Sequence, residues 1–439
     1  MQTVRTIDAR GRSEAAVAEL VALRRPLAFD PLADEDEAAQ SVRRVIAAVR
    51  DRGDEALVEL NRSLEGADTP AGRLRVAPAE IEAARRALPG ELRDAIRLAI
   101  ENLRRYQRHA LLKPPQPIAD RGRELADRYR PLRRVAVWTP GASAPLPSTT
   151  IHCAVPAQVA GVPEIVLLAP PRVDNDIHPV TLGVAGELGL SEVYRVGGTH
   201  GVAAAALGTA TIRRVDKIVG PGSRYVQLAK KFLFGLIDVE SFAGPSELIV
   251  IADASADPVT VAVDLLAQAE HDPGMAVLVA LDEALAATVV EELPQQAAGL
   301  ARGEQALACM ARYGAVVLVA SREQAAEVTD AFAPEHLHIQ TDRPAELADA
   351  IDCAGAIFLG PWTPESAGDY VAGPSHVLPT GGTARFFSAL SANDFMRHTS
   401  VLAYNAMAIR EDAAAIAALA EAEGLSAHAE AARRREARR

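Results

Sequence analysis

The chain has 439 residues, more than one compact core normally serves, so we expect two main domains with appendages. Apolar residues make up 49% and charged residues 24%, an ordinary balance for a soluble globular enzyme. The net charge of −12 argues against nucleic acid as the main ligand, because phosphate binding relies on a clustered basic surface. No apolar stretch reaches the roughly 18 to 20 residues of a membrane span, and charged residues interrupt the start of the chain where a signal peptide would be apolar. We therefore expect a cytoplasmic protein without a membrane partner.

The first third of the chain predicts helices. Apolar residues recur at helical spacing over residues 35–59, and the same pattern continues over residues 77–110 with a break near Gly90. The proline-rich segment 113–117 then predicts an extended linker. We assign residues 1–29 to an N-terminal arm.

Beyond the linker, short apolar runs alternate with helical stretches, which predicts βαβ units and parallel sheets. One set of predicted strands covers residues 134–138, 165–169, 193–196 and 217–219, and a second set covers 248–252, 276–281, 315–320, 337–339 and 356–359. In the second set, Asp257 and Pro258 predict the start of a helix.

The similarity of the two sets predicts an α/β fold with two similar Rossmann-like parallel-sheet domains and helical appendages at both ends. We assign residues 30–138 together with 247–386 to the first domain and residues 139–246 to the second. Residues 387–439 are expected to form a helical C-terminal piece that breaks at Gly424.

Three glycine-containing turns follow predicted strands, at residues 140–143, 197–201 and 220–223. A strand, a glycine turn and a helix bring backbone N–H groups and a positive helix end to the carboxyl edge of a sheet, where nucleotides bind. None of the turns is a complete GxGxxG motif, and each alone is equally typical of an ordinary tight turn. Three in one domain favour a dinucleotide.

Several polar residues occur where packing alone would not favour them. Gln268 and His271 lie three apart on a predicted helix face, and Glu335 and His336 stand at the start of a predicted strand. A glycine- and proline-rich stretch around Asp369 is long enough to be a functional loop. Each pattern is found more often at an exposed helix end or by chance than in a metal site. The residues alone therefore indicate an α/β enzyme, in which a metal site with nitrogen and oxygen ligands is one alternative.

Taken in order, short strings of residues along the chain resemble the histidinol dehydrogenase family. They span about residues 40 to 430 and lie at 52–57, 242–247, 268–271, 332–337, 358–360, 368–370, 376–380, 383–386 and 423–425, followed by His428. The resemblance implies NAD-linked, zinc-dependent oxidation of L-histidinol through histidinal to L-histidine, the last steps of histidine biosynthesis.

The resemblance also implies roles for individual residues. Zinc would be bound by Gln268, His271, Asp369 and His428, a donor set that suits this metal. It further implies a homodimer whose C-terminal piece crosses to the partner, so that His428 would complete the other subunit's site.

In the family pattern, Glu335 and His336 form the acid–base pair. His336 would take the alcohol proton as hydride leaves, and Glu335 would activate water to attack the aldehyde. Further positions match residues that contact the small-molecule substrate, namely Ser246, His376, Glu423 and Tyr370.

The chain departs from the family pattern on the NAD side. Trp138 stands where a tyrosine is usual, His200 where a glutamine is usual, and Ser223 where an asparagine is usual. These side chains can still pack or hydrogen-bond, so we predict them as altered cofactor contacts. Ser375 also replaces a common asparagine before His376.

Three hypotheses remain open from the sequence. The first is oxidation of histidinol, and the second is a family dehydrogenase that acts on a different amino or hydroxyl alcohol. The third is a zinc-holding binding protein that has lost its cofactor, which predicts no detectable NAD binding. The sequence does not distinguish NAD from NADP.

Overall fold

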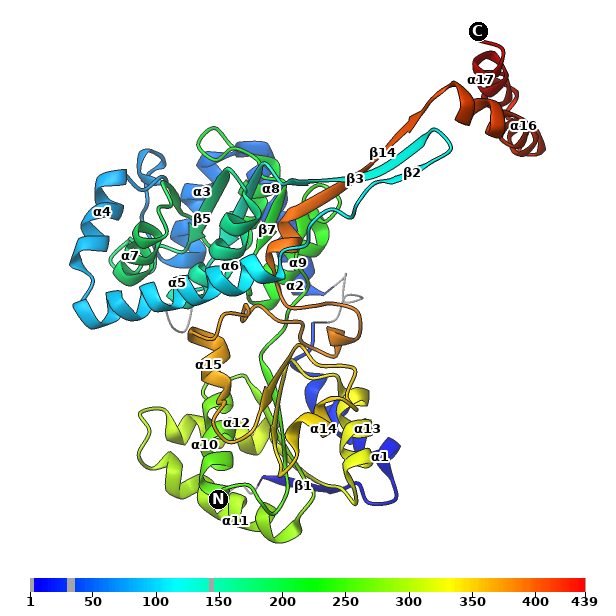
Figure 1. Cartoon of the computed structure of the whole chain (residues 1–439). Helices are drawn as coiled ribbons and strands as arrows, with labels where there is room; N and C mark the ends of the chain where they lie inside the picture. The colour runs from blue at the N-terminus through cyan, green and yellow to red at the C-terminus, as the bar shows by residue number, and fades with distance from the viewer. Residues whose placement is uncertain (1–3, 30–35, 142–145, 439) are drawn as a thin grey trace.

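The computed structural model describes residues 4–29, 36–141 and 146–438. Within these residues the chain folds around two separate sheets of six and five strands, and a ribbon of three strands projects from the body as an arm (Figure 1). In this described part of the chain, no helix is both long and apolar enough to cross a membrane.

The five-stranded sheet is parallel throughout and has the strand order β6-β5-β4-β7-β8. Its strands are β4 (Arg134–Trp138), β5 (Glu164–Ala169), β6 (Glu192–Arg195), β7 (Lys217–Val219) and β8 (Asp238–Val239). The helices associated with it are α2 (Glu37–Arg52), α3 (Asp54–Leu60), α4 (Pro78–Ala87), α5 (Gly90–Ala110), α6 (Pro147–Ala160), α7 (Pro179–Glu187), α8 (Gly198–Leu207) and α9 (Arg224–Leu233), with short helical turns at Asn61–Glu65 and Ala71–Arg73. We call this part the five-stranded unit.

The six-stranded sheet is also parallel and has the order β1-β11-β10-β9-β12-β13. Its strands are β1 (Arg5–Asp8), β9 (Glu247–Ala252), β10 (Met275–Ala280), β11 (Ala315–Leu318), β12 (His336–Gln340) and β13 (Ala356–Leu359). Its helices are α1 (Ser13–Arg24), α10 (Pro258–Ala269), α11 (Glu283–Ala297), α12 (Gly303–Tyr313), α13 (Arg322–Phe332), α14 (Pro344–Ala348) and α15 (Glu365–Tyr370). We call this part the six-stranded unit.

Both units share one strand order when the strands are numbered within each unit. Counted from the first strand of each set, both β11-β10-β9-β12-β13 and β6-β5-β4-β7-β8 have the order 3-2-1-4-5. The larger sheet has β1 as an additional strand at one edge. The order reverses after the first strand of each set, as in doubly wound α/β sheets. The prediction of two similar parallel α/β domains is therefore confirmed at the level of sheet topology.

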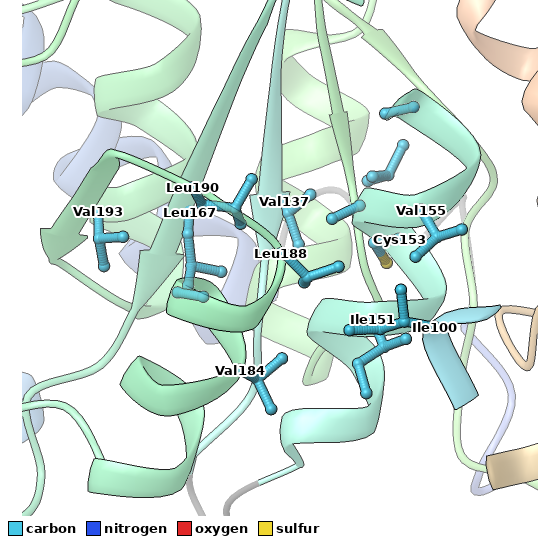
Figure 2. Packing of buried hydrophobic residues seen from close by; sticks show 14 of the residues in the cluster. Ile100, Val137, Ile151, Cys153, Val155, Leu167, Val184, Leu188, Leu190 and Val193 are labelled. Carbon is cyan, nitrogen blue, oxygen red and sulfur yellow. The ribbon is translucent and has the colours of Figure 1, made fainter. Parts of the chain in front are cut away.

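Each sheet has a hydrophobic core on both faces, because neighbouring residues of a strand point to opposite sides. Val135 and Val137 of β4 belong to one core, whereas Ala136 and Trp138 belong to the other. Figure 2 shows the first of these cores, where Val137 lies among side chains of α6, α7 and β5. In the six-stranded unit, Ile249 and Leu248 of β9 divide between two cores in the same way.

The predicted domain boundaries are wrong in the N-terminal half. Residues 30–138 were assigned with 247–386, but apolar residues of α2 and α5, such as Val42 and Ile96, pack against the five-stranded sheet. Strand β4 is the central strand of that sheet. The helical periodicity identifies an apolar face, but it does not specify which of two sheets covers that face.

The described part of the N-terminal arm is not a free appendage. Strand β1 pairs with β11, and Leu20 of α1 is buried in a core of the six-stranded unit. The chain therefore begins in one unit, builds most of the other, and returns to complete the first.

The C-terminal piece is helical only in its last part. Residues 396–404, predicted as helix, form strand β14 (Met396–Tyr404), which pairs along its whole length with β3 (Arg123–Pro131). Strand β2 (Ile118–Asp120) completes this antiparallel ribbon, and two 3₁₀ turns at Thr383–Arg385 and Ala392–Phe395 precede it. Helices α16 (Ala406–Ala422) and α17 (Ser426–Glu436) follow at the tip of the arm, far from the body (Figure 1). Gly424, with φ of 75°, separates the two helices as predicted.

A candidate active site between the two units

A cleft with a volume of about 200 Å³ lies between the two units. The five-stranded unit contributes residues that follow β4 and β7, at the carboxyl edge of its sheet. The six-stranded unit contributes residues that precede β9, β10 and β12, at the amino edge of its sheet. The lining residues are Leu146, Ser148, Thr149, Pro221, Ala243, Gly244, Ser246, His271, Glu335, His336, Asp369, Tyr370, His376, Val377, Leu378 and Thr380.

Most predicted site residues of the body meet in this cleft, although they are far apart in the sequence. Ser246, His271 and Glu335 come from the loops before three strands, and His336 is the first residue of β12. Asp369 and Tyr370 end helix α15, and His376 follows in the next loop. The cleft thus brings together two of the four predicted zinc ligands, both predicted acid–base residues and three of the four predicted substrate contacts.

His336 is buried and surrounded by oxygen atoms. Its Nδ1 lies 3.1 Å from the backbone oxygen of Glu247, 3.3 Å from Glu365 Oε1 and 3.5 Å from Glu335 Oε2. Its Nε2 lies 3.7 Å from Asp369 Oδ1 and has no hydrogen-bond partner among the described residues. In the neutral form of the ring, this geometry places the proton on Nδ1, towards the Glu247 carbonyl, so Nε2 is the nitrogen that takes up a second proton.

Burial opposes charge on His336, but the carboxylates of Glu365, Glu335 and Asp369 outweigh it and raise its pKa to about 10. Burial also raises the pKa of Glu335 and of Glu365. Several carboxyl groups and one imidazole therefore compete for protons in a small buried volume. Such a cluster favours uptake of a proton at His336.

Glu335 is held by the neighbouring strand. Its Oε2 accepts a hydrogen bond of 2.9 Å from the backbone N–H of Glu247 at the start of β9. Gly355 permits the backbone of Glu335 to come close, since a Cβ at that glycine would lie 2.6 Å from the Glu335 oxygen. The pairing of β12 with β9 and β13 thus fixes the acid–base pair in place.

Glu365 was missed by the sequence analysis. It lies four residues before Asp369 on α15, is buried, and neither of its carboxylate oxygens has a hydrogen-bond partner within the described ranges. The spacing of a glutamate and an aspartate on one helix face was the available signal. The helix has only six residues, too few for its periodicity to stand out.

Gln268 and His271 lie at the carboxyl end of α10. Gln268 is fully buried, and its Oε1 accepts a hydrogen bond of 3.3 Å from Ser246 Oγ. Its Nε2 finds no partner in the part of the chain that the structure describes. Within that same part, no group of three or more His, Cys, Asp and Glu residues has the arrangement of a metal site.

The remaining predicted ligand and substrate residues lie elsewhere. Glu423 follows α16, and His428 belongs to α17, both at the tip of the arm and exposed. Figure 1 places these helices at the tip of the arm, away from the body of the same chain. A single chain therefore does not bring His428 and Glu423 to the other site residues.

The predicted cofactor contacts differ in their positions. Trp138 ends β4 and is buried in a core, while Ser223 is exposed before α9. His200 is fully buried in α8, where its Nε2 lies 2.9 Å from Asn61 Oδ1. Burial lowers the pKa of His200 to about 3, so its imidazole is neutral. None of the three belongs to the lining of the cleft, although Pro221 in the turn before Ser223 does.

The three glycine turns also differ. Residues 142 and 143 of the first turn lie outside the described residues. At the second turn, Glu65 Oε1 lies 3.0 Å from where a Cβ of Gly197 or Gly198 would be, and Glu65 pairs with Arg172. An anionic group thus already occupies the start of α8, which argues against the predicted phosphate site there. The third turn, at residues 220–223, borders the cleft through Pro221.

Comparisons with known proteins agree over nearly the whole chain. The sequence pattern of a family described as histidinol dehydrogenase matches residues 30–436. Histidinol dehydrogenase of Moorella thermoacetica is 46% identical over 406 residues, covering 92% of this chain and 96% of that protein. The Synechococcus sp. enzyme of the same name is 45% identical, covering 90% and 92% respectively. The crystal structure of histidinol dehydrogenase from Elizabethkingia anophelis matches with a TM-score of 0.91 at 31% identity, covering 99% of this chain and 98% of that chain.

Proposed function

Since this chain belongs to the histidinol dehydrogenase family, we propose that it oxidises L-histidinol through histidinal to L-histidine with NAD as the oxidant. The proposal rests above all on one observation. The buried pair Glu335 and His336 shares a cleft with Ser246, Asp369 and His376, and that cleft lies between two units of like topology. An acid–base pair beside a binding cavity suits proton removal coupled to hydride transfer.

The residues of the cleft divide the chemistry between them. His336 accepts the hydroxyl proton at Nε2 as hydride leaves the carbinol carbon for one NAD. Its surrounding carboxylates favour the imidazolium that forms. Glu335 then removes a proton from water as it attacks the aldehyde carbon, and a second NAD accepts the second hydride. Two NAD are reduced for each alcohol converted to the acid.

A zinc ion is the second component of the proposal. The donors fit it in part, because His271 and Asp369 line the cleft and the buried amide of Gln268 offers its oxygen beside Ser246, which also lines the cleft. Mixed nitrogen and oxygen donors suit zinc. When bound, the ion supplies a fixed positive charge that orients an amino alcohol. We propose Gln268, His271 and Asp369 as its ligands from one chain.

A homodimer would supply the missing residues. His428 and Glu423 lie on a projecting arm, and the exposed apolar side chains of Leu419 and Leu425 lie beside them. A large apolar residue at a projecting tip favours a protein partner over water. We propose that the arm crosses to a second copy of this chain, where His428 is the fourth ligand and Glu423 contacts the substrate.

NAD would enter from the five-stranded unit. The residues after β4 and β7 border the cleft at the carboxyl edge of that sheet, the edge at which doubly wound sheets bind nucleotides. We propose that Trp138, His200 and Ser223 mark the altered cofactor region. Because His200 is engaged with Asn61, it would act by shaping the floor of this region.

A second candidate function follows from these departures. Since the residues that differ from the family pattern gather on the cofactor side, the chain could act on another amino alcohol or prefer another nicotinamide cofactor. The discriminating experiment compares kcat/KM for L-histidinol with that for a panel of small amino and hydroxyl alcohols, each with NAD and with NADP. A preference for L-histidinol with NAD supports the proposal. A larger kcat/KM for another alcohol would replace the substrate and retain the reaction.

A further inference from the structure

His152 is a buried histidine that the proposed chemistry does not use. It lies in α6, whose first turn borders the cleft through Ser148 and Thr149. Its side chain has no exposed surface and sits one turn of helix from the cleft residues.

Three contacts join His152 to the segment that carries His376. The backbone N–H of His376 donates a hydrogen bond of 3.0 Å to His152 Nδ1. The two imidazole rings are stacked, with centroids 4.0 Å apart and planes 11° from parallel. Ser375 Oγ donates a hydrogen bond of 3.1 Å to the backbone oxygen of His152. His152 thus contacts the backbone and the ring of His376 and the side chain of Ser375.

These contacts fix the proton positions in both rings. Because His152 Nδ1 accepts a hydrogen bond, a neutral His152 carries its proton on Nε2. His376 Nδ1 lies 3.0 Å from the backbone oxygen of Asp369, so its proton is on Nδ1 and its Nε2 is a bare acceptor. Burial lowers the pKa of His152, which keeps this ring neutral.

His376 therefore presents an unused acceptor. Its Nε2 has no hydrogen-bond partner within the described parts of the chain, and the residue lines the cleft. A buried acceptor without a partner is costly unless a ligand supplies a donor. The ammonium group or a ring N–H of an amino alcohol is such a donor.

We propose that His152 is a positioning residue, which holds the His376 ring in the orientation that accepts a hydrogen bond from a nitrogen donor of the substrate. The proposal rests on the proposed function for the identity of the substrate. It also connects the two units, since α6 belongs to the five-stranded unit and His376 follows β13 of the six-stranded unit. A residue on the proposed cofactor side of the cleft, His152, would thereby orient a residue on the substrate side, His376.

The first test compares steady-state kinetics of His152→Phe with those of the wild type. Phenylalanine keeps an aromatic ring for the stack but removes the acceptor for the His376 N–H. We expect KM for the amino alcohol to rise about tenfold while kcat changes less than threefold, because ground-state binding and transition-state binding are weakened alike. His152→Asn, whose amide oxygen can replace Nδ1 as acceptor, should recover part of the loss.

Two controls separate positioning from stability. Cys153→Ala alters a neighbour of His152 on the same helix, whose side chain is fully buried in a hydrophobic core. Within the described residues no hydrogen bond or ring contact joins Cys153 to residues 375–376, so this variant should leave KM unchanged. In a His376→Ala background, His152→Phe should raise KM no further, since the two residues act as one unit. Additive effects, or an equal rise in Cys153→Ala, would overturn the proposal.

A last measurement does not depend on turnover. Hydrogen exchange by mass spectrometry should show slow exchange of the His376 amide in the wild type and in Cys153→Ala, and faster exchange in His152→Phe. If phenylalanine is not accommodated, His152→Leu removes the acceptor without a ring and should show the same exchange. Unchanged exchange in a folded His152 variant contradicts the proposal. An inactive wild type with the expected exchange pattern would instead reject the proposed function alone.

Discussion

At the scale of single residues, the acid–base pair makes two separable contributions. In the proposed reaction His336 would take the alcohol proton and Glu335 would activate water, so the second oxidation would depend more on the glutamate. Glu335→Gln keeps the shape of the side chain and its ability to accept from the Glu247 N–H. We expect acid formation to slow by about 10²- to 10⁴-fold, the usual contribution of a general base.

The measurement is a rapid-mixing experiment that follows NADH and the organic product together. Glu335→Gln should still release NADH in the first oxidation while histidine formation lags behind. His336→Gln should slow both steps to a similar extent. Equal slowing of both steps by the two variants would contradict the division of roles.

His200 gives a prediction about pH and stability. Its pKa is lowered to about 3 in the folded chain, from an ordinary value of 6.5. A histidine whose pKa is lower in the folded chain than in the unfolded chain binds more protons when the chain is unfolded. The folded state therefore has its full stability above pH 6.5 and loses stability as the pH falls towards 3. At pH 5 the free energy of unfolding is lower by about 2 kcal/mol, because each pKa unit corresponds to about 1.36 kcal/mol.

The test compares thermal unfolding of the wild type and of His200→Gln at pH 7 and at pH 5. Glutamine is the usual family residue at this position, can bond Asn61 and does not titrate. The midpoint of the variant should fall less between the two pH values than that of the wild type. Equal falls would show that His200 is not a buried neutral histidine.

At the scale of elements, the turn between β7 and α9 supports the cofactor side of the cleft. Gly220 has φ of 128°, and a Cβ there would overlap the backbone oxygen of Trp138. Glu240 Oε1 accepts from the Gly220 N–H at 2.8 Å, and Lys230 bonds both that carboxylate and the Gly220 oxygen. The turn is thus held from both sides.

Gly220→Ala should therefore lower the thermal midpoint and raise KM for NAD. Gly235→Ala is the matched control, because Gly235 also has positive φ, at 93°, but a Cβ there would meet no atom of the described residues within 4 Å. The control should cost only the backbone strain of about 1–3 kcal/mol and leave KM for NAD unchanged. Equal effects of the two variants on KM would mean that this turn does not support cofactor binding.

Most elements of the two units could be predicted from the sequence, because buried parallel strands appear as short apolar runs with clear boundaries. The prediction placed β4 at residues 134–138 and β13 at 356–359, and the structure agrees. It missed β3 and β14, since no residue of either arm strand is buried and neither strand shows an apolar face. It also misassigned α2 and α5, whose apolar faces do not reveal which sheet they cover.

The site could be predicted only by family resemblance. Periodicity places Gln268 and His271 together, but no pattern shows that they meet Glu335 and Asp369, which are distant in sequence. Glu365 and His152 were missed because each depends on contacts formed only in the folded chain. His200 was noted as a departure, but its burial against Asn61 could not be predicted from its sequence neighbours.

At the scale of the whole molecule, the proposed homodimer would make the site depend on the projecting arm of a second chain. The chain that contributes Glu335 would receive His428 from its partner. A mixture of two variants, Glu335→Gln and His428→Ala, then tests the arrangement. Unfolding and refolding them together forms mixed dimers in which one site has both intact residues.

The activity measured is histidine formation, because Glu335→Gln should still carry out the first oxidation. We expect each variant alone to form little histidine and the refolded mixture to recover up to about a quarter of the wild-type rate, because half of randomly paired dimers are mixed and each has one intact site. Mixing without refolding is the control and should recover little. No recovery after refolding, with dimers confirmed by sedimentation, would contradict a site shared between chains.

The central claim is a four-electron oxidation of histidinol in the cleft between the two units. It is tested most directly by measuring the NADH formed when zinc-loaded protein consumes a limiting amount of L-histidinol with excess NAD. The account predicts two NADH for each L-histidinol, with L-histidine as the only product. No NADH from folded, zinc-loaded protein, or a single NADH with release of the aldehyde, would contradict it.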